Sequence, residues 1–319
     1  MTNETVPFIT GDQIRQAVPI ADLLDAVEEA YRAVSDGADR SPLRSHVPLD
    51  AGDLLLMPGV RAGAKGFSVK LVTVVGSNAA RGLPTVQAVV VWFDAATGRA
   101  TAFLDGPTLT AMRTGAASGV ATRLLARRGA SVAAIIGAGA QAEWQLRAVL
   151  AARPISRFLV HARGAAAREG FAERMTAETG VLVEGVATAE EAVRPADVVC
   201  CATTSSTPVF DAAWLRPGAH VNGIGAFQLG MVELPPELFS RVSLVAVDSR
   251  AAAMAEAGDV VAAIEAGVLR EDSLVEIGSV DRSWADARPD EAITAFKSVG
   301  LAIQDVAAAE LIVSRVLSP

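Results

Sequence analysis

The sequence of 319 residues predicts an α/β protein, in which a doubly wound parallel sheet follows a smaller α+β region. Two observations predict the sheet. From about residue 129, short apolar segments alternate with segments of helical periodicity, and the apolar segments are continuous rather than interrupted by polar residues. Such strands are typical of parallel sheets with helices on both faces. The expected strands are 132–136, 158–160, 181–186, 198–202, 220–224 and 244–247, and the expected helices include 141–151, 165–178 and 189–193.

The region before residue 129 combines helical spacing with strand patterns. Thr10 and Gln13 have the spacing of a capping box, and apolar residues after Pro19 recur at helical intervals up to a C-terminal cap at Gly37. The expected strands are 44–48, 53–57, 66–75, 85–93 and 99–104, with the last two forming a hairpin around 94–98. A helix rich in small residues over 108–127 and a final helix from residue 300 complete the expected elements.

Composition and charge limit the classes of function. The longest apolar run covers residues 88–93, far below the ~18 residues of a membrane span, and the first residues lack a signal-peptide pattern. The two cysteines, Cys200 and Cys201, are adjacent, which suits neither a disulfide nor a zinc site. A net charge of -8 disfavours nucleic-acid binding. We therefore expect a cytoplasmic protein with no metal and no membrane or nucleic-acid partner.

Lysine is rare in this chain, since the 28 basic residues include only Lys65, Lys70 and Lys297. Either an ammonium group is needed at these positions, or lysine has survived there by chance, and the sequence leaves both readings open. In the expected strand 66–75, Lys70 shares one face with Ser68 and Val72. The other face carries Phe67, Val69 and Leu71.

A glycine-rich turn joins the expected strand 132–136 to the following helix. Its residues form the pattern G-x-G-x-x-A and are Gly137, Ala138, Gly139, Ala140, Gln141 and Ala142. Gly137 permits the tight turn, Gly139 lets backbone N–H groups approach a pyrophosphate, and Ala142 keeps the helix close to the sheet. This context predicts a dinucleotide-binding Rossmann domain with the cofactor on residues 137–141. The alternative is a glycine-rich turn that binds no nucleotide.

The end of the next strand bears on cofactor choice. An acidic residue about 20 positions after the glycine turn would hold the ribose hydroxyls of NAD. This chain has His161, Ala162 and Arg163 there, and the nearest acid, Glu169, lies inside the following helix. Arg163 could pair with the 2′-phosphate of NADP, or it could be a solvated surface arginine. We expect NADP(H) to be preferred, with NAD(H) possible.

Several separated segments share one pattern in their order and spacing. They are residues 44–46, 53–58, 69–73, 82–87, 104–106, 110–118, 137–141, 201–205 and 297–300. Over nearly its whole length the chain resembles the ornithine cyclodeaminase/mu-crystallin family. The resemblance implies a substrate-binding and dimerisation domain of residues 1–117 with 301–319, a Rossmann domain of residues 118–300, and a homodimer.

In that family, residues matching Arg44, Lys70 and Arg113 hold the substrate carboxylate, and the resemblance adds Met57 and Phe227 to the substrate site. A charge in an apolar strand or among small helical residues is costly without a partner, which an amino or imino acid would supply. The alternatives are an ion pair of Arg113 with Asp105 or Asp94, an edge lysine that blocks strand pairing, and a loop arginine at position 44.

The resemblance also implies three further cofactor contacts. It suggests Thr85 near the nicotinamide, Thr203 along the cofactor and Ser298 near the carboxamide. Phe227 aligns with the position where cyclodeaminases carry an acidic residue that acts on the substrate amine. Phenylalanine cannot take a proton, so the chain is closer in motif to the ketimine reductases, which reduce Δ1-pyrroline-2-carboxylate and Δ1-piperideine-2-carboxylate.

The function that these residues favour is NAD(P)H-dependent reduction of a cyclic α-imino acid, with Lys70, Arg113 and Arg44 as catalytic residues. Lys70 or a bound water is the expected proton source, and His46 is a weaker candidate. His161 and His220 are interpreted as structural. The alternatives are an amino-acid dehydrogenase similar to alanine dehydrogenase, an ornithine cyclodeaminase, and a non-catalytic protein that binds NADPH or a small ligand.

Overall fold

The computed structural model describes residues 5–317, and packing divides the chain into two compact units. Unit 1 comprises residues 1–113 and 301–319, and unit 2 comprises residues 114–300. The first boundary falls inside helix α3 (Gly106–Leu125), after Arg113 rather than after residue 117. In the part of the chain that the structure describes, no helix has the length and hydropathy needed to cross a membrane.

Unit 1 is built on a six-stranded sheet in the order β1-β6-β5-β4-β3-β2. Its strands are β1 (Phe8–Ile9), β2 (Ser45–Leu49), β3 (Gly52–Val60), β4 (Gly66–Val74), β5 (Val86–Asp94) and β6 (Ala100–Asp105). All neighbouring strands are antiparallel except β1 and β6. The predicted hairpin is present between β5 and β6, where the Asp94 carboxylate accepts from the backbone N–H of Thr97 at 2.8 Å.

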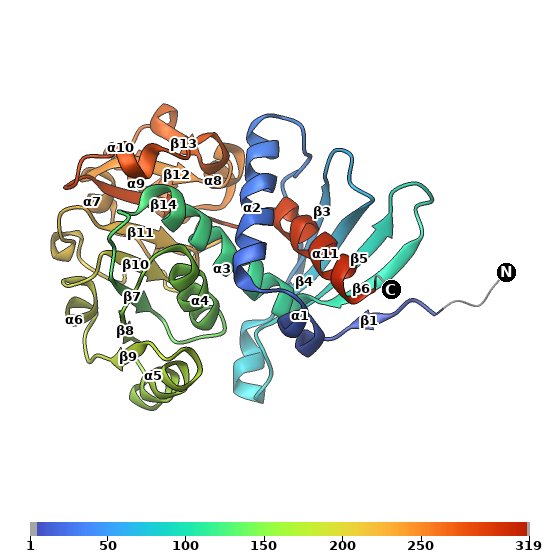
Figure 1. Cartoon of the computed structure of the whole chain (residues 1–319), viewed down its shortest axis with the longest axis horizontal. Helices are drawn as coiled ribbons and strands as arrows, with labels where there is room; N and C mark the ends of the chain where they lie inside the picture. Colours follow the sequence, from blue (N-terminus) through green and yellow to red (C-terminus); the bar gives the residue numbers. More distant parts are fainter. Residues whose placement is uncertain (1–4, 318–319) are drawn as a thin grey trace. The chain divides into compact units, whose positions relative to one another are not determined.

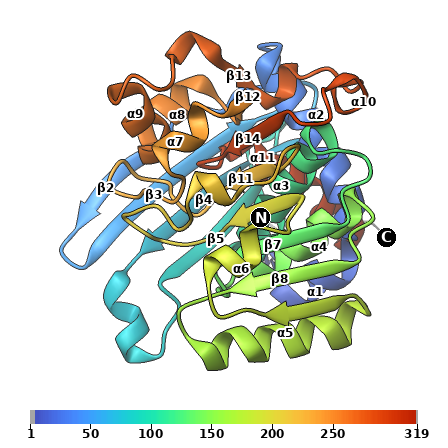
Figure 2. The same cartoon turned by 90° about the vertical axis from the view of Figure 1, so that its left-hand side faces the viewer.

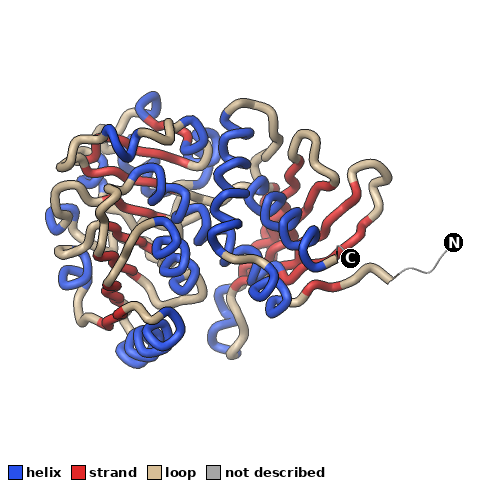
Figure 3. The backbone as a smooth tube through the Cα atoms, viewed as in Figure 1, coloured by secondary structure: helices blue, strands red, loops and turns tan. Residues whose placement is uncertain are grey.

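The helices of unit 1 gather on one face of this sheet (Figures 1 and 3). They are α1 (Gly11–Ala17), α2 (Ile20–Ser35) and α11 (Ala302–Val316), whereas the short η1 (Gly76–Arg81) lies in the connection between β4 and β5. The predicted capping box begins α1, since Thr10 N–H donates to Gln13 Oε1 at 2.9 Å. Helix α11 packs on β3, β4 and β5, with α2 beside it. A Cβ added at Gly59 would lie 2.7 Å from Val306 Cγ2, so β3 and α11 approach closely.

Unit 2 is built on an eight-stranded sheet, parallel throughout, in the order β13-β12-β14-β11-β10-β7-β8-β9. Its strands are β7 (Val132–Ile136), β8 (Arg157–His161), β9 (Leu182–Gly185), β10 (Val198–Cys201), β11 (His220–Gly223), β12 (Val242–Val247), β13 (Leu274–Glu276) and β14 (Ile293–Lys297). From β7 the sheet extends through β8 and β9 on one side and through β10 and β11 on the other, which confirms the predicted doubly wound sheet.

Strands β13 and β14 were not expected from the sequence. Strand β13 has only three residues, and β14 contains Thr294 and Lys297, which interrupt the apolar run although both are buried. Strand β14 inserts between β11 and β12, so sequence order alone would also have misplaced it. The six predicted strands are all present, with ends that differ by one or two residues.

The helices of unit 2 pack against its sheet, and Figure 2 shows α4 and α5 beside β7 and β8. They are α4 (Ala142–Ala152), α5 (Ala165–Thr179), α6 (Ala189–Val193), α7 (Pro236–Phe239), α8 (Arg250–Glu256), α9 (Gly258–Glu265) and α10 (Trp284–Ala287), together with the C-terminal part of α3 and the short η2 (Ala212–Trp214), η3 (Glu271–Ser273) and η4 (Ile277–Ser279). The small residues of α3 allow a close crossing, because a Cβ at Gly115 would lie 2.4 Å from the Trp144 carbonyl oxygen.

Candidate active site

Two buried cations of unit 1 meet on one carboxylate. Lys70 Nζ lies 2.8 Å from Asp305 Oδ2 and donates to Oδ1 at 3.1 Å. Arg113 Nε donates to the same Oδ1 at 3.0 Å. The three side chains are almost inaccessible, with Lys70 1%, Arg113 5% and Asp305 0% exposed. Together with Gln304 we call these residues the Asp305 cluster.

The partners of these cations differ from the alternatives drawn from the sequence. Lys70 is not an edge lysine, because β4 lies between β3 and β5. Arg113 forms an internal ion pair, but with Asp305 rather than with Asp94 or Asp105. Asp94 accepts from Thr97, and Asp105 accepts from the N–H of Thr108 at 2.9 Å. This last bond also starts α3 at Gly106, two residues before the expected position.

The remaining predicted substrate residues of unit 1 lie near Lys70. Met57 is its cross-strand partner on β3, is 2% exposed, and therefore shares its face of the sheet. Arg44 is half-buried just before β2, and its positive charge contributes to the pKa of Lys70. The structure thus brings Arg44, Met57, Lys70 and Arg113 into one region of unit 1.

The surroundings of Lys70 in the Asp305 cluster give its ammonium group an unusually low pKa. Burial lowers the pKa of Lys70 from 10.5 to about 7; Asp305 opposes this effect, and the positive charges of Arg113 and Arg44 add to it. A lysine in this range can give up a proton near neutral pH. With two cations on one carboxylate and the charge of Arg44 near Lys70, this region also favours the arrival of a further anion.

Two members of the Asp305 cluster, Gln304 and Asp305, were not expected from the sequence. Gln304 accepts from Arg113 Nη1 at 2.9 Å and donates from Nε2 to the Tyr31 hydroxyl, which fixes its amide. Asp305 joins Lys70 and Arg113 from α11. A signal was present, since Asp305 is a charged residue within the otherwise uncharged run 302–309 of the last helix. Buried carboxylates of this kind need cationic or hydrogen-bonding partners.

The histidines do not belong to the Asp305 cluster. His46 Nε2 lies 2.5 Å from Asp53 Oδ1, between β2 and β3, and its side chain is 53% exposed. His220 is fully buried, with ring nitrogens 2.9 Å from Thr294 Oγ1 and 3.1 Å from Asn222 Oδ1. Burial lowers the pKa of His220 to about 3, so its ring is neutral. His161 lies at the end of β8, with Nδ1 3.3 Å from the Val186 carbonyl oxygen.

In unit 2 the glycine turn has the geometry that a dinucleotide requires. Gly137 has a φ of 109°, and a Cβ there would lie 2.6 Å from the Ala202 carbonyl oxygen, so only glycine fits. A Cβ at Gly139 would meet no atom within 4 Å, so its backbone borders open space directly before α4. The residues present therefore fit a pyrophosphate at the N-terminus of this helix.

Most of the predicted cofactor residues lie at one edge of the unit 2 sheet. Residues 137–141, Arg163, Thr203 and Ser298 follow the carboxyl ends of β7, β8, β10 and β14. Arg163 is exposed, and Phe227 is partly exposed in the segment after β11. Ser298 is 2% exposed and donates to Asp248 Oδ2 at 2.9 Å. Thr85 lies in unit 1, just before β5.

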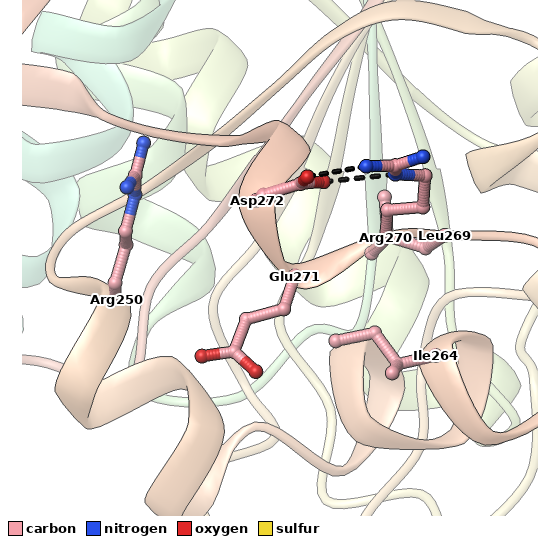
Figure 4. A pocket seen from close by; sticks show the side chains of 6 residues that line it. All are labelled: Arg250, Ile264, Leu269, Arg270, Glu271 and Asp272. Carbon is pink, nitrogen blue, oxygen red and sulfur yellow. Dashed lines mark hydrogen bonds and ion pairs between the residues drawn. The ribbon is translucent and has the colours of Figure 1, made fainter.

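A surface pocket lies beside β13, the strand at one end of the unit 2 sheet. Figure 4 shows its lining residues, which are Arg250, Ile264, Leu269, Arg270, Glu271 and Asp272. Arg270 and Asp272, two positions apart in the sequence, pair with each other, and Arg270 Nε donates to Asp272 Oδ1 at 2.9 Å. None of the predicted site residues lines this pocket, and we assign it no role.

Comparison with known proteins agrees with the resemblance seen in the sequence. The model of the ornithine cyclodeaminase/mu-crystallin family matches residues 7–319. A Δ1-pyrroline-2-carboxylate reductase of Bacillus cereus is 34% identical over 313 residues, covering 97% of this chain and 96% of the relative.

Two solved structures are similar over nearly their whole length. The Δ1-pyrroline-2-carboxylate reductase of Thermococcus litoralis, in complex with NADH and L-proline, has a TM-score of 0.91 and 33% identity, covering 97% of each chain. An archaeal alanine dehydrogenase dimer with bound NAD has a TM-score of 0.88 and 32% identity, covering 97% of this chain and 95% of the other.

Proposed function

Because the chain belongs to the ornithine cyclodeaminase/mu-crystallin family, we propose that it reduces a cyclic α-imino acid to the cyclic amino acid with NAD(P)H. The reaction we favour converts Δ1-pyrroline-2-carboxylate to proline. The observation that carries the proposal is the pair of buried cations, Lys70 and Arg113, that share the single carboxylate of Asp305, with the positive charge of Arg44 near Lys70. Such a group of cations suits a small substrate whose one fixed charge is an α-carboxylate.

The first task of the chain is to bind and orient the imino acid. The guanidinium of Arg113 is held by Asp305 and Gln304, so it is preorganised before the substrate arrives. A substrate carboxylate placed among Arg44, Lys70 and Arg113 would be fixed at one end of the molecule. Orientation of this kind lowers the entropic part of the barrier.

The second task is to supply a proton. When bound, the reduced nicotinamide supplies a hydride to the C=N carbon. The imine nitrogen must gain one proton to complete the secondary amine, and Lys70 is its source. A pKa of about 7 makes Lys70 a competent acid at neutral pH. The substrate carboxylate adds a negative charge beside the ammonium group and favours its protonated form before the transfer.

The residues of unit 2 would bind the cofactor and shape the substrate side. Residues 137–141 would hold the pyrophosphate, with Thr203 and Ser298 further along the dinucleotide. Arg163 would favour NADP(H) by pairing with the 2′-phosphate of that cofactor. NAD(H) would also be accepted, since the two solved relatives described above hold NADH and NAD. Phe227 offers the substrate an apolar surface and no carboxylate, which favours a reductase over a cyclodeaminase.

We also propose a homodimer formed through the second face of the unit 1 sheet. This face carries Phe67, Val69 and Leu71 of β4, all only partly buried, and Phe67 stacks on Phe93 with ring centroids 4.9 Å apart. Partly exposed apolar residues on two neighbouring strands suit an equivalent sheet of a second copy. The similar archaeal alanine dehydrogenase is a dimer.

Light scattering tests the dimer. We expect twice the monomer mass for the wild-type chain and the monomer mass for Val69→Glu, because a charge at the centre of the apolar face cannot be buried without a partner. Lys65→Glu, at an exposed position just before β4, is the matched control and should remain dimeric. A monomeric wild-type chain would contradict this proposal.

The near-ultraviolet absorbance of NADPH tests the reaction itself. We expect it to fall when the protein meets Δ1-pyrroline-2-carboxylate. Consumption of NADPH only with pyruvate and ammonium would instead favour an alanine dehydrogenase, the second candidate that the similarity to the archaeal enzyme supports. Release of ammonia from ornithine would favour a cyclodeaminase. No turnover in any of these assays would leave a ligand-binding protein.

A further inference from the structure

A second buried ionic network lies in unit 2, at the carboxyl ends of β10, β11 and β14. It consists of Glu233, Asp259 and Lys297, which are 0%, 0% and 1% exposed. Lys297 ends β14, and its Nζ lies 2.5 Å from Asp259 Oδ2, at the first turn of α9. We call these three residues the unit 2 anchor. It contains one of the three lysines that the sequence retains.

Glu233 holds two loops by their backbones. Its Oε1 accepts from the N–H of Thr203 at 2.5 Å. Its Oε2 accepts from the N–H groups of Gly225 at 2.7 Å and Ala226 at 2.9 Å. Thr203 follows β10, whereas Gly225 and Ala226 follow β11. One carboxylate therefore ties together the segments that leave two adjacent strands, through hydrogen bonds that its charge strengthens.

Asp259 in turn holds Glu233 in place. Its Oδ1 accepts from the N–H groups of Glu233 at 2.5 Å and Leu234 at 2.9 Å, while Lys297 pairs with its other oxygen. The chain of contacts runs from β14 through α9 to the backbone of Glu233, and from the Glu233 side chain to the two loops. A shift of Asp259 would therefore be transmitted to Thr203 and Gly225.

The held segments pack directly against the glycine turn. A Cβ at Gly225 would lie 2.0 Å from the Thr203 carbonyl oxygen, so no side chain fits between these segments. A Cβ at Gly137 would lie 3.3 Å from Thr203 Cγ2 and 2.6 Å from the Ala202 carbonyl oxygen. Backbones in such contact cannot shift independently. The position of Thr203, which Glu233 holds, therefore limits the position of the turn.

We propose that Glu233 is a positioning residue for the dinucleotide and, through Ala226, for the substrate-facing Phe227. With Asp259 and Lys297 it holds the segments after β10 and β11 at the spacing from Gly137 that a bound cofactor requires. This inference rests on the proposed function, because the role of both segments follows from the expected binding of NAD(P)H and an imino acid.

The test compares two buried carboxylates that both accept backbone N–H groups. Glu233→Gln replaces one carboxylate oxygen with an NH2 group, which cannot accept from the loop N–H groups. The matched control, Asp197→Asn, alters a carboxylate that is 4% exposed and accepts from Ser131 at 2.9 Å and Val132 at 3.1 Å, at the amino end of β7. We expect both variants to lower Tm, and only Glu233→Gln to raise the Kd of both NADH and NADPH, by about tenfold or more.

Hydrogen exchange of the wild-type chain provides a measurement that needs no variant. The amides of Thr203, Gly225 and Ala226 should exchange slowly without cofactor, and adding NADPH should slow all three together. Exchange as fast as that of exposed Gly230 would overturn the proposal, as would a Glu233→Gln variant with unchanged Kd values. A chain that binds NADPH without reducing an imine would refute the proposed reaction alone, whereas a chain that binds neither dinucleotide would refute both.

Discussion

The two buried lysines of this protein, Lys70 in unit 1 and Lys297 in unit 2, both pair with an aspartate but in opposite surroundings. Around Lys70 the cations are in excess, because Arg113 shares Asp305 with it and Arg44 is close by. Around Lys297 the anions are in excess, because Glu233 joins Asp259, and backbone N–H groups satisfy both carboxylates. The first group favours the arrival of an anion, whereas the second is complete by itself.

The titration of the two groups reflects this difference. Burial lowers the pKa of Lys70 to about 7, whereas burial raises the pKa of Glu233 and is opposed by Lys297 and the Thr203 N–H. A group that titrates near neutral pH suits proton transfer, whereas a carboxylate whose oxygens both accept N–H groups suits the positioning of loops. Under the proposed function, similar ionic side chains would thus serve chemistry in one unit and structure in the other.

Replacing each buried lysine with alanine is the strongest test of this comparison. Lys70→Ala should reduce kcat by about a thousandfold or more, because it removes the proton donor and part of the carboxylate site, and it should leave the Kd of NADPH nearly unchanged. Lys297→Ala should lower stability instead, by about 3–5 kcal/mol, because it leaves the buried Asp259 charge unpaired. Steady-state kinetics, fluorescence titration and thermal unfolding separate the two effects.

Lys65→Ala is the control for both lysine variants, since Lys65 is exposed, and it should change none of these quantities. If Lys70→Ala abolished NADPH binding together with turnover, Lys70 would be a structural residue and the contrast with Lys297 would disappear.

Asp305→Asn sharpens the comparison within unit 1. Asp305 raises the pKa of Lys70, so its neutralisation should lower that pKa further. Because the reaction needs protonated Lys70, kcat/KM of the wild type should fall as the pH rises through about 7. In the variant this fall should begin at lower pH, and kcat at neutral pH should decrease by about 10- to 100-fold.

The pH profile distinguishes this role of Asp305 from a purely structural one, which would lower activity equally at every pH. Glu310→Gln is the matched control, since Glu310 is on the same helix but pairs with Arg61 at 3.1 Å. An unshifted profile for Asp305→Asn would mean that Asp305 does not control Lys70.

The smallest effect concerns cofactor discrimination in unit 2. Arg163→Asp should raise the Kd of NADPH relative to that of NADH by about tenfold, because the carboxylate repels the 2′-phosphate. Glu233→Gln, in contrast, should weaken both cofactors alike, since the anchor holds backbone that both would share. Equal effects of Arg163→Asp on the two cofactors would identify Arg163 as a surface residue without a role in selection.

The local features of the fold could be predicted from the sequence because they depend on neighbouring residues. Continuous apolar runs predicted the six strands 132–136 to 244–247, and the spacing of Gly137, Gly139 and Ala142 predicted the turn between β7 and α4. The charge of Lys70 in an apolar strand and that of Arg113 among small residues also indicated that both side chains needed an anionic partner.

The identity of that partner was decided by the tertiary structure. Asp305 is separated by 235 residues from Lys70 and by 192 residues from Arg113, and they meet because α11 returns to the sheet of unit 1. The nearby acids Asp94 and Asp105 proved to be the wrong partners, because turn and helix N–H groups already use their oxygens. The position of β14 between β11 and β12 was likewise decided by contacts between residues distant in the sequence. Periodicity records which face of an element is buried, but only the folded chain determines which distant element covers it.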